Sequence, residues 1–456
     1  MFAKSGRRYG RSSTCTDWWY NTVSHSQFYQ VVLFNNGILP HRDRSTYDPT
    51  LTSAVSYTVA SAGAAPSSLT FGKEFMEIAG TYDGNVTIGF NRRLNNISNS
   101  IAAAKVAVED IPSLFAIELG NEPDLYSGTD PIAVNDTWNV TLDQKSQILW
   151  QKTVGSELGL TNFIEAGVYL QPPKWSTALL APLEVSNDAS QYVKSFSDHS
   201  YPQSACSGSS TDLESLMTHS NIVDYTVKYK GDADAAHDIG KTFVLGETNS
   251  ATCGGGGISP TFGAGLWIID YIMQALLNHE PLGTVGPPPP ILSHAPNSRW
   301  TSDNLLGQYC WWGKYDMGAP FYGAYFVASA LAGADKVVQL DDGATDYAVY
   351  AVYESGSPLR AVLYNSEYYT SGTRSSTTFS LSNLGSSQSS VKAKRLTAPY
   401  ATSRVDRGGN PSFGGQTFAN VTCAIQGTET FETTTVTSGV ATFTVGASEA
   451  LLVYLA

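Results

Sequence analysis

The sequence predicts an α/β protein, a (β/α)8 TIM barrel followed by an all-β sandwich. Two observations predict this order. From about residue 69 to residue 273, short strand-like segments alternate with longer helix-like ones, as the repeated βα units of a parallel barrel do. Beyond about residue 335 the helical periodicity stops, and strand-like segments are separated by Gly, Ser and Asn turns. The length of 456 residues suits two such domains.

Within the barrel region, each predicted element follows from its local pattern. Short apolar or β-branched runs bounded by turn residues predict strands at residues 86–90, 115–119, 162–170, 193–196 and 243–245. Longer segments between them predict helices at residues 97–111, 142–158, 177–183, 211–229 and 262–278. The pattern is weak where the first strands and the eighth strand belong, so it leaves the completeness of the barrel open.

The chain is predicted to divide into three parts. Residues 1–60 form an atypical N-terminal segment with part of the barrel start, residues 61–333 the catalytic barrel, and residues 334–456 the C-terminal β-sandwich domain. The boundary is expected to follow a helix at residues 322–331. The clearest strands beyond it are predicted at residues 347–353, 360–364 and 451–455.

The composition narrows the class of protein. Apolar residues make up 42% of the chain, charged residues only 15%, and the net charge is −13. Binding to a phosphate backbone needs a basic surface, so no nucleic-acid partner is expected. No membrane span is expected either, because the best apolar run, residues 262–277, is interrupted by Asp270. The composition is typical of a secreted, acid-tolerant hydrolase, and we expect a monomer.

The expected location is extracellular, although two observations disagree about it. Five N-x-S/T sequons, at Asn85, Asn96, Asn135, Asn139 and Asn420, are candidate glycosylation sites of a secreted protein. Residues 1–16, in contrast, are basic and Ser-rich and lack the apolar stretch of a signal peptide.

The cysteines leave two alternatives. Cys206, Cys253 and Cys310 are each expected in a loop after a late barrel strand, so one pair of them could form a disulfide across the mouth of the site. Free or buried thiols are an equally good interpretation. The chain has no C-x-x-C or H-E-x-x-H spacing, and neither a metal site nor a cofactor is predicted.

Two glutamates carry the functional prediction. Glu122, in Leu-Gly-Asn-Glu-Pro-Asp, and Glu247, in Val-Leu-Gly-Glu-Thr-Asn, each follow a short strand of buried type. Carboxylates at two strand ends are what a barrel glycosidase needs, since one protonates the leaving oxygen while the other attacks or stabilises the anomeric carbon. An isolated Gly-Asn-Glu-Pro would more often be a solvated turn. Its place after a strand, and its pairing with a second strand-end Glu, favour the functional interpretation.

Three further residues near these strand ends are candidate substrate contacts. Asn121 precedes Glu122 and is a candidate donor to a sugar 2-hydroxyl. Tyr201 and His199 flank another strand end, and a tyrosine that reached the nucleophile would orient it. A histidine at such a position is as often a hydrogen-bonded core residue, so both interpretations of His199 stay open.

Several segments together resemble glycoside hydrolase family 79, in its fungal β-glucuronidase-like branch related to heparanase. The similar stretches are residues 85–92, 116–124, 261–267, 308–313, 318–326 and 394–399. The resemblance implies a barrel with a β-sandwich C-terminal domain and a retaining mechanism. It also implies Glu122 as the acid/base and Glu247 as the nucleophile, and it leaves Tyr309 and Trp311 as candidate subsite contacts.

Two segments depart from the family pattern. Residues 36–43 lack the Gly-Gly-Asn-Thr of the family's first strand-end motif, and Asp43 is retained as a candidate sugar contact. Residues 280–305 contain four consecutive prolines, 287–290, which cannot form a central strand where the eighth strand is expected. Barrel closure and the pocket for the glucuronate carboxylate are the questions that the sequence leaves open.

The predicted function is a retaining exo-β-glucuronidase, or 4-O-methyl-glucuronidase, that hydrolyses terminal β-linked glucuronic acid from glycans with the two glutamates. One alternative is a β-glucosidase or β-xylosidase of the same fold, because no Lys or Arg cluster marks a uronate pocket. The other is an inactive carbohydrate-binding remnant, in which the departures have removed the geometry and kept the glutamates.

Overall fold

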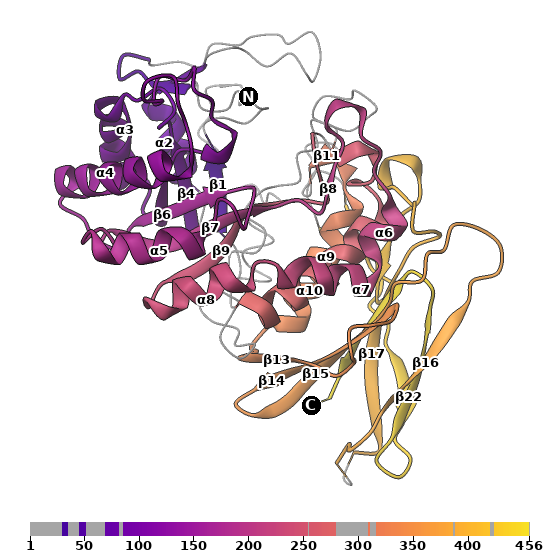
Figure 1. Ribbon diagram of the computed structural model, residues 1–456. Helices are drawn as coiled ribbons and strands as arrows, with labels where there is room; N and C mark the ends of the chain where they lie inside the picture. The colour runs from indigo at the N-terminus through magenta and orange to yellow at the C-terminus, as the bar shows by residue number, and fades with distance from the viewer. Residues whose placement is uncertain are drawn as a thin grey trace.

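A computed structural model describes residues 30–34, 45–51, 69–81, 85–253, 255–279, 309–310, 316–385, 388–419 and 424–455. Figure 1 shows a parallel sheet with helices in the N-terminal part and an all-β part, coloured orange to yellow, at the C-terminus. This curled parallel sheet with helices, followed by an all-β domain, confirms the predicted fold class. None of the described helices combines the length and the apolar character that crossing a bilayer requires.

The parallel sheet carries the candidate site. Its strands lie in the order β1-β4-β5-β6-β7-β9, and every neighbouring pair is parallel. They are β1 (Gln30–Phe34), β4 (Asn85–Phe90), β5 (Leu114–Leu119), β6 (Ile164–Tyr169), β7 (Val193–Ser200) and β9 (Thr242–Thr248). Because parallel strands end at the same edge of a sheet, residues that follow β5, β7 and β9 meet there.

Helices connect and cover these strands. They are α2 (Lys73–Ala79), α3 (Ile97–Asp110), α4 (Val140–Leu158), α5 (Thr177–Ser186), α6 (Leu213–Met217), α7 (His219–Val227), α8 (Lys230–Asp238), α9 (Phe262–His279) and α10 (Ala319–Leu331). Two of them begin at sequon asparagines. Asn96 accepts a hydrogen bond from the Asn99 N–H at the start of α3, and Asn139 accepts one from the Leu142 N–H at the start of α4.

Short strand pairs lie outside the main sheet. β2 (Ser45–Tyr47) pairs with β3 (Leu69–Phe71), β8 (Gln203–Ser204) with β10 (Ala251–Thr252), and β11 (Tyr309–Cys310) with β12 (Asp316–Met317).

Three elements differ from the sequence prediction. The single helix predicted at residues 211–229 was wrong, because the chain is extended at Thr218 (φ −63°, ψ 122°) and separates α6 from α7. β7 is longer than predicted, so that it includes His199. β1 lies within residues 1–60, the segment without clear strand pattern, and pairs in register with β4.

The C-terminal domain is a sandwich of two sheets. The larger sheet has the order β13-β14-β15-β23-β17-β18, with β21 also paired to β17, and the smaller one pairs β16 with β22. The strands are β13 (Lys336–Gln339), β14 (Tyr347–Glu354), β15 (Ser357–Asn365), β16 (Ser376–Leu381), β17 (Ser390–Thr397), β18 (Ser412–Phe413), β21 (Glu432–Thr435), β22 (Ala441–Gly446) and β23 (Glu449–Tyr454). A short hairpin, β19 (Thr417–Phe418) with β20 (Ile425–Gln426), completes the domain.

Both faces of the larger sheet are buried, and this joins the two domains. On β15, Leu363 packs into the sandwich core, whereas its neighbour Val362 packs into a core that also contains Trp267 of α9 and Phe326 of α10. This alternation is the period-2 pattern of a strand. One continuous apolar cluster therefore extends from the barrel helices into the β domain.

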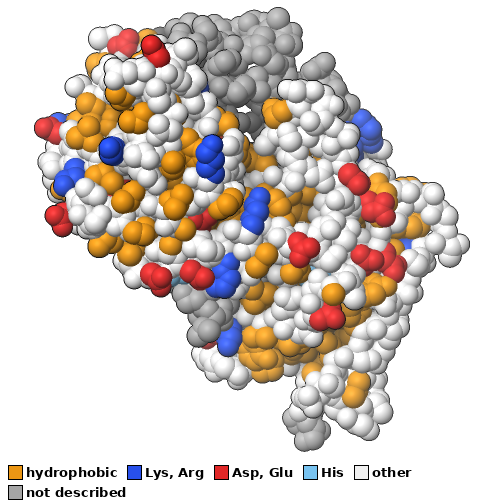
Figure 2. All heavy atoms as spheres, in the orientation of Figure 1, with side chains coloured by type: hydrophobic (Ala, Val, Ile, Leu, Met, Phe, Trp, Pro, Cys, Tyr) orange, Lys and Arg blue, Asp and Glu red, His pale blue; other side chains and the backbone are white. Residues whose placement is uncertain are grey.

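On the surface, charged side chains are sparse. On the face that Figure 2 shows, the Lys and Arg side chains (blue) are separated from one another and form no continuous basic patch. Apolar side chains are exposed on α4 and α5, including those of Leu149 and Leu183.

Candidate active site

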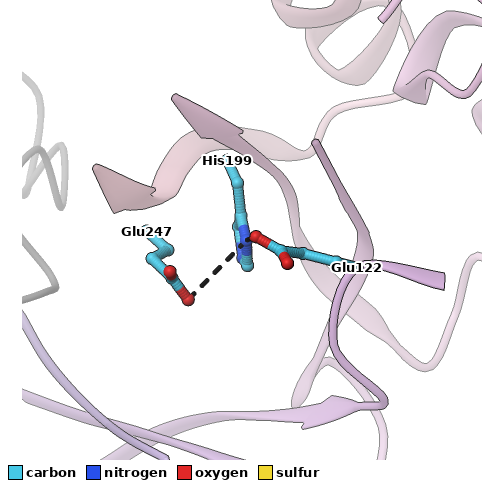
Figure 3. A group of neighbouring side chains, drawn as sticks. All are labelled: Glu122, His199 and Glu247. Carbon is cyan, nitrogen blue, oxygen red and sulfur yellow. Dashed lines mark hydrogen bonds and ion pairs between the residues drawn. The ribbon is translucent and has the colours of Figure 1, made fainter. Parts of the chain in front are cut away.

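Four residues from the ends of β5, β7 and β9 converge. The Nδ1 atom of His199 lies 3.0 Å from Oε1 of Glu122 and 3.7 Å from Oε2 of Glu247. One carboxylate oxygen of Glu122 lies within 4.8 Å of one of Glu247. The Tyr201 hydroxyl donates a short hydrogen bond to Oε1 of Glu247. Figure 3 shows the two glutamates on opposite sides of the His199 ring, pointing toward each other.

Glu122 is placed by an unusual backbone conformation. Its φ of 44° and ψ of 60° lie in the left-handed region, which non-glycine residues rarely adopt. The Glu122 N–H donates to the carbonyl oxygen of Val168 on β6 (3.1 Å), and its own carbonyl accepts from Leu125 (2.8 Å). These bonds open the short 3-10 helix η1 (Pro123–Leu125). Strained residues of this kind persist where the surroundings hold them, and they cluster at functional sites.

A β-bulge places Glu247 beside His199. Asp198 pairs with Leu245, and the next residue, His199, pairs with Glu247, so that Gly246 is the extra residue on β9. A Cβ atom at Gly246 would lie 2.1 Å from Oγ of Ser197, far inside contact distance. The bulge therefore needs glycine at this position, and it turns the glutamate that follows toward the histidine.

Buried hydroxyls tie the ends of β7 and β9 together. The Thr248 hydroxyl donates to the Ser200 carbonyl (2.7 Å), and the Tyr271 hydroxyl donates to Oγ of Ser200 (2.6 Å). Tyr225 lies behind them, with its hydroxyl 3.3 Å from Oγ of Ser200. Ser200 follows His199 and Thr248 follows Glu247, so this network limits the movement of both site residues.

A disulfide joins the two loops that leave the site. Cys206, after β7, is bonded to Cys253, after β9. The same loops pair through β8 and β10, and the Thr211 hydroxyl donates to the Gly256 carbonyl (2.9 Å). The disulfide interpretation of the cysteines is thus confirmed for this pair, and Cys310 lies on β11.

One residue of the site was missed by the sequence analysis. Asp124 lies two residues after Glu122, and its Oδ2 atom accepts a hydrogen bond from the Leu170 N–H (3.0 Å). Burial raises the pKa of Asp124, repulsion from Glu122 raises it further, and the result is a pKa of about 7. At acidic pH this neighbour of Glu122 is therefore uncharged. The signal in the sequence was the Asp of Asn-Glu-Pro-Asp.

The other predicted contacts have mixed outcomes. Asn121 is buried, and its N–H donates to the Tyr126 hydroxyl (3.3 Å). Tyr309 belongs to β11, but its side chain, like the whole of Asp43 and Trp311, lies outside the described residues. Their roles stay predictions.

The sequons differ in exposure. Asn96, Asn135 and Asn139 are exposed. Asn85, at the start of β4, is half-buried, and Asn420 lies outside the described residues.

The donor atoms of Glu122, His199 and Glu247 are also of kinds that hold metal ions. Here, however, His199 contacts the Glu122 carboxylate and Tyr201 donates to that of Glu247. The arrangement is that of two carboxyls oriented by hydrogen-bonding side chains, which suits proton transfer and nucleophilic attack.

Comparison with known proteins places the chain in a family. Residues 349–452 match the model of the glycosyl hydrolase family 79 C-terminal beta domain. A β-glucuronidase from Aspergillus niger is 28% identical over 359 residues, and one from Neurospora crassa is 27% identical over 385 residues. The matches cover 71% and 73% of this chain, and the chain spans 62% of the length of each relative.

A solved structure is similar over nearly the whole chain. It is a 4-O-α-L-rhamnosyl-β-D-glucuronidase from Fusarium oxysporum 12S, in complex with Rha-GlcA. It is 46% identical in sequence, with a TM-score of 0.86, and the match covers 98% of this chain and 93% of that one. These findings confirm the resemblance drawn from the sequence, and the chain belongs to glycoside hydrolase family 79, in its fungal β-glucuronidase-like branch.

Proposed function

We propose that this protein is a retaining β-glucuronidase that hydrolyses terminal β-linked glucuronic acid from glycans. The separation of the two carboxylates carries the proposal, because one oxygen of Glu122 lies within 4.8 Å of one of Glu247. Retaining glycosidases hold their carboxyls about 5–5.5 Å apart, whereas inverting ones leave roughly 6.5–9.5 Å for a water molecule. The names of the two fungal relatives support the choice of glucuronic acid.

In the first step, the Glu247 carboxylate attacks the anomeric carbon and forms a glycosyl-enzyme bond. The Glu122 carboxyl gives its proton to the glycosidic oxygen as the bond from that oxygen to the anomeric carbon breaks. The hydrogen bond from Tyr201 holds the Glu247 carboxyl in one orientation for this attack.

In the second step, water replaces the leaving group. Glu122, now ionised, takes a proton from the water as its oxygen attacks the anomeric carbon, and Glu247 leaves as a carboxylate. The His199 ring, with Nδ1 3.0 Å from Glu122, holds the acid/base in place through both steps. Two inversions at one carbon retain the β configuration.

A second candidate substrate is a glucuronide that carries a 4-O-linked rhamnose. The observation that favours it is the 46% identity to the Fusarium oxysporum 4-O-α-L-rhamnosyl-β-D-glucuronidase, well above the 28% identity to the Aspergillus niger β-glucuronidase. The reaction and the two glutamates would be the same, and the difference would lie in the space beyond the glucuronate 4-oxygen.

We also propose that the protein works outside the cell. Disulfides persist mainly in oxidising compartments, and Cys206 is bonded to Cys253. Three exposed sequons, among them Asn135, suit a secreted glycoprotein. Expression in a secretory host should give a protein whose mass falls on treatment with an endoglycosidase.

The activity is tested with chromogenic glycosides. The purified chain should hydrolyse nitrophenyl β-glucuronide faster than nitrophenyl β-glucoside, and Glu247→Gln should abolish the reaction. Glu214→Gln, which removes an exposed carboxylate from α6, is the matched control and should keep full activity. Faster release from a rhamnosyl-glucuronide would select the second candidate substrate. Equal rates for Glu247→Gln and wild type would overturn the mechanism.

A further inference from the structure

Below the catalytic glutamates, the inside of the curled sheet holds a second pair of carboxyls. Glu118 on β5 is the register partner of Glu165 on β6, and Glu165 is the partner of Ser195 on β7. Glu118 is 0% exposed and Glu165 is 1% exposed. The interior of a parallel barrel is normally filled by branched apolar side chains, so two neighbouring acids at this depth indicate a specific role.

Because the two residues are register partners on neighbouring strands and both are buried, their carboxyls lie on the same face of the sheet, side by side. The Ser195 hydroxyl donates a hydrogen bond, 2.9 Å long, to Oε2 of Glu165. Two neighbouring buried carboxyls resist carrying a negative charge each, so the pair favours a state in which one of them keeps its proton. Burial raises the pKa of Glu165, which also favours that proton.

The pair packs against the segment that carries Glu247. A Cβ atom at Gly246 would lie 2.9 Å from Oε1 of Glu165, so the Glu165 carboxyl occupies the space beside the Gly246 backbone. Gly246 is the extra residue of the bulge and directly precedes Glu247. The position of the buried carboxyl and the position of the Glu247 backbone are therefore linked.

Charge also connects the pair to the site. Electrostatic attraction joins Glu165 to His199, whose Nδ1 atom contacts Glu122. Lys194, on the same strand as His199, is attracted to Glu165 as well. Around the pair, β7 contributes Lys194 and His199 as titratable groups, β9 contributes Gly246, and β4 contributes Gly89, the register partner of Glu118.

We propose that Glu118 and Glu165 are positioning residues of the reaction, a carboxyl pair that shares one proton, supports Gly246 and keeps one negative charge behind His199. With no proton the two carboxylates would repel each other, and with two protons the charge would be lost. The single charge favours the protonated forms of the carboxyls above it, so the pair sets the pH range of the enzyme without touching substrate. The proposal rests on the proposed glycosidase activity and adds these residues to it.

The test compares single and double substitutions. Glu118→Gln and Glu165→Gln each replace one carboxyl by an amide, which donates to the remaining carboxylate as the shared proton does. Each single variant should therefore keep both limbs of the pH profile of kcat/KM. The double variant removes the charge, and both limbs should move to lower pH by about one unit. Glu184→Gln, a buried acid on α5, is the control and should leave the limbs unchanged.

Two results would overturn the proposal. One is a double variant with unchanged limbs, which would make the pair merely structural. The other is a single variant whose limbs move as far as those of the double variant, which would mean that no proton is shared.

A spectroscopic measurement covers the case in which the double variant does not fold. At neutral pH, the infrared difference between wild type and Glu165→Gln should contain the C=O stretch of a protonated carboxyl, and its absence would overturn the proposal. This measurement needs no activity. If the wild type hydrolyses no glycoside, the proposed function fails, and the infrared difference still decides whether the pair shares a proton.

Discussion

The hydroxyl of Tyr201 donates a hydrogen bond to Oε1 of Glu247, across the gap between the ends of β7 and β9. The tyrosine that orients Glu247, the proposed nucleophile, therefore follows a different strand than the one that carries Glu247. Any change that shifts these two strand ends against each other therefore affects the position of the Glu247 carboxyl.

Removing the Tyr201 hydroxyl should lower the rate of the first chemical step. We expect Tyr201→Phe to reduce kcat/KM by roughly 10²–10³-fold, the usual effect of losing one donor to a charged group in an active site. Steady-state kinetics on nitrophenyl β-glucuronide measure this. Tyr225→Phe loses a hydroxyl one layer further back, near Ser200, and should have a much smaller effect. Equal effects of the two variants would contradict the direct role of Tyr201.

Adding a methyl group at Gly246 should inactivate the enzyme. The Cβ atom of Gly246→Ala would lie 2.1 Å from Oγ of Ser197, so β9 must shift beside Glu247. We expect a loss of roughly 1–3 kcal/mol in stability together with most of the activity. Ser197→Ala in the same chain removes the clashing oxygen and should restore part of both. The matched control is Gly231→Ala in α8, which meets no atom within 4 Å and should leave the activity unchanged.

Reduction of the Cys206–Cys253 disulfide should loosen both loops of the site. We expect Cys206→Ser with Cys253→Ser to lower the stability by roughly 2–4 kcal/mol and to raise KM, because each loop begins next to a site residue. A reductant should lower the Tm of the wild type to that of this variant. It should not change the variant itself, and a shift there would show that another thiol is responsible.

Buried carboxyls should make the protein less stable as the pH rises. Burial raises the pKa of Glu184 from 4.5 to about 8. A raised pKa means that the folded state holds the proton more tightly than the unfolded chain does. The stabilisation that comes from the Glu184 proton is therefore complete below pH 4.5 and is lost as the pH rises through 8. Glu184→Gln should flatten the fall of Tm over this interval, and an unchanged slope would exclude Glu184 as its source.

A buried ion cluster between the domains should stabilise the protein over a pH range that is limited on both sides. Nδ1 of His219 lies 2.7 Å from Asp270, and Nε2 lies 3.0 Å from Asp341. Burial lowers the pKa of His219, but attraction to Asp270 and the hydrogen bonds that the ring donates to both acids outweigh this effect and raise the pKa to about 10. Burial raises the pKa of Asp341, yet hydrogen bonds from His219 and its neighbours lower it to about 2.

The two pKa shifts define the pH range in which this cluster stabilises the folded protein. The His219 contribution is complete below pH 6.5 and is lost as the pH rises through 10, while the Asp341 contribution is complete above pH 3.8 and is lost as the pH falls through 2. Asp341→Asn should cost roughly 3–5 kcal/mol between these limits, measured by denaturant unfolding. Lys230→Ala breaks an exposed ion pair on α8 and should change little, which separates burial from charge loss.

Local patterns were enough to find β5, β9 and the two glutamates, because β5 and β9 contain short apolar runs, with Glu122 shortly after the run of β5 and Glu247 at the end of β9. The sequence named Tyr201 as a residue that could reach Glu247, and the hydrogen bond between them agrees with this. It left the role of His199 open, because the pairing of His199 with Glu247 depends on a bulge at Gly246 that a local pattern does not reveal. The break at Thr218 was missed for a similar reason. The buried positions of α6 and α7 continue one apolar pattern across it, so periodicity alone does not reveal the extended residue.

Val362 of β15 packs in one apolar cluster with Trp267 and Phe326 of the barrel helices. This shared cluster affects how the chain folds. Neither domain can be removed without exposing half of a common interior. We therefore expect one cooperative melting transition for the whole chain. The β domain covers part of the apolar core of the barrel helices, so it is not a detachable sugar-binding module. A protein cut after α10 should be insoluble, and any attempt to exchange the β domain must carry α9 and α10 with it.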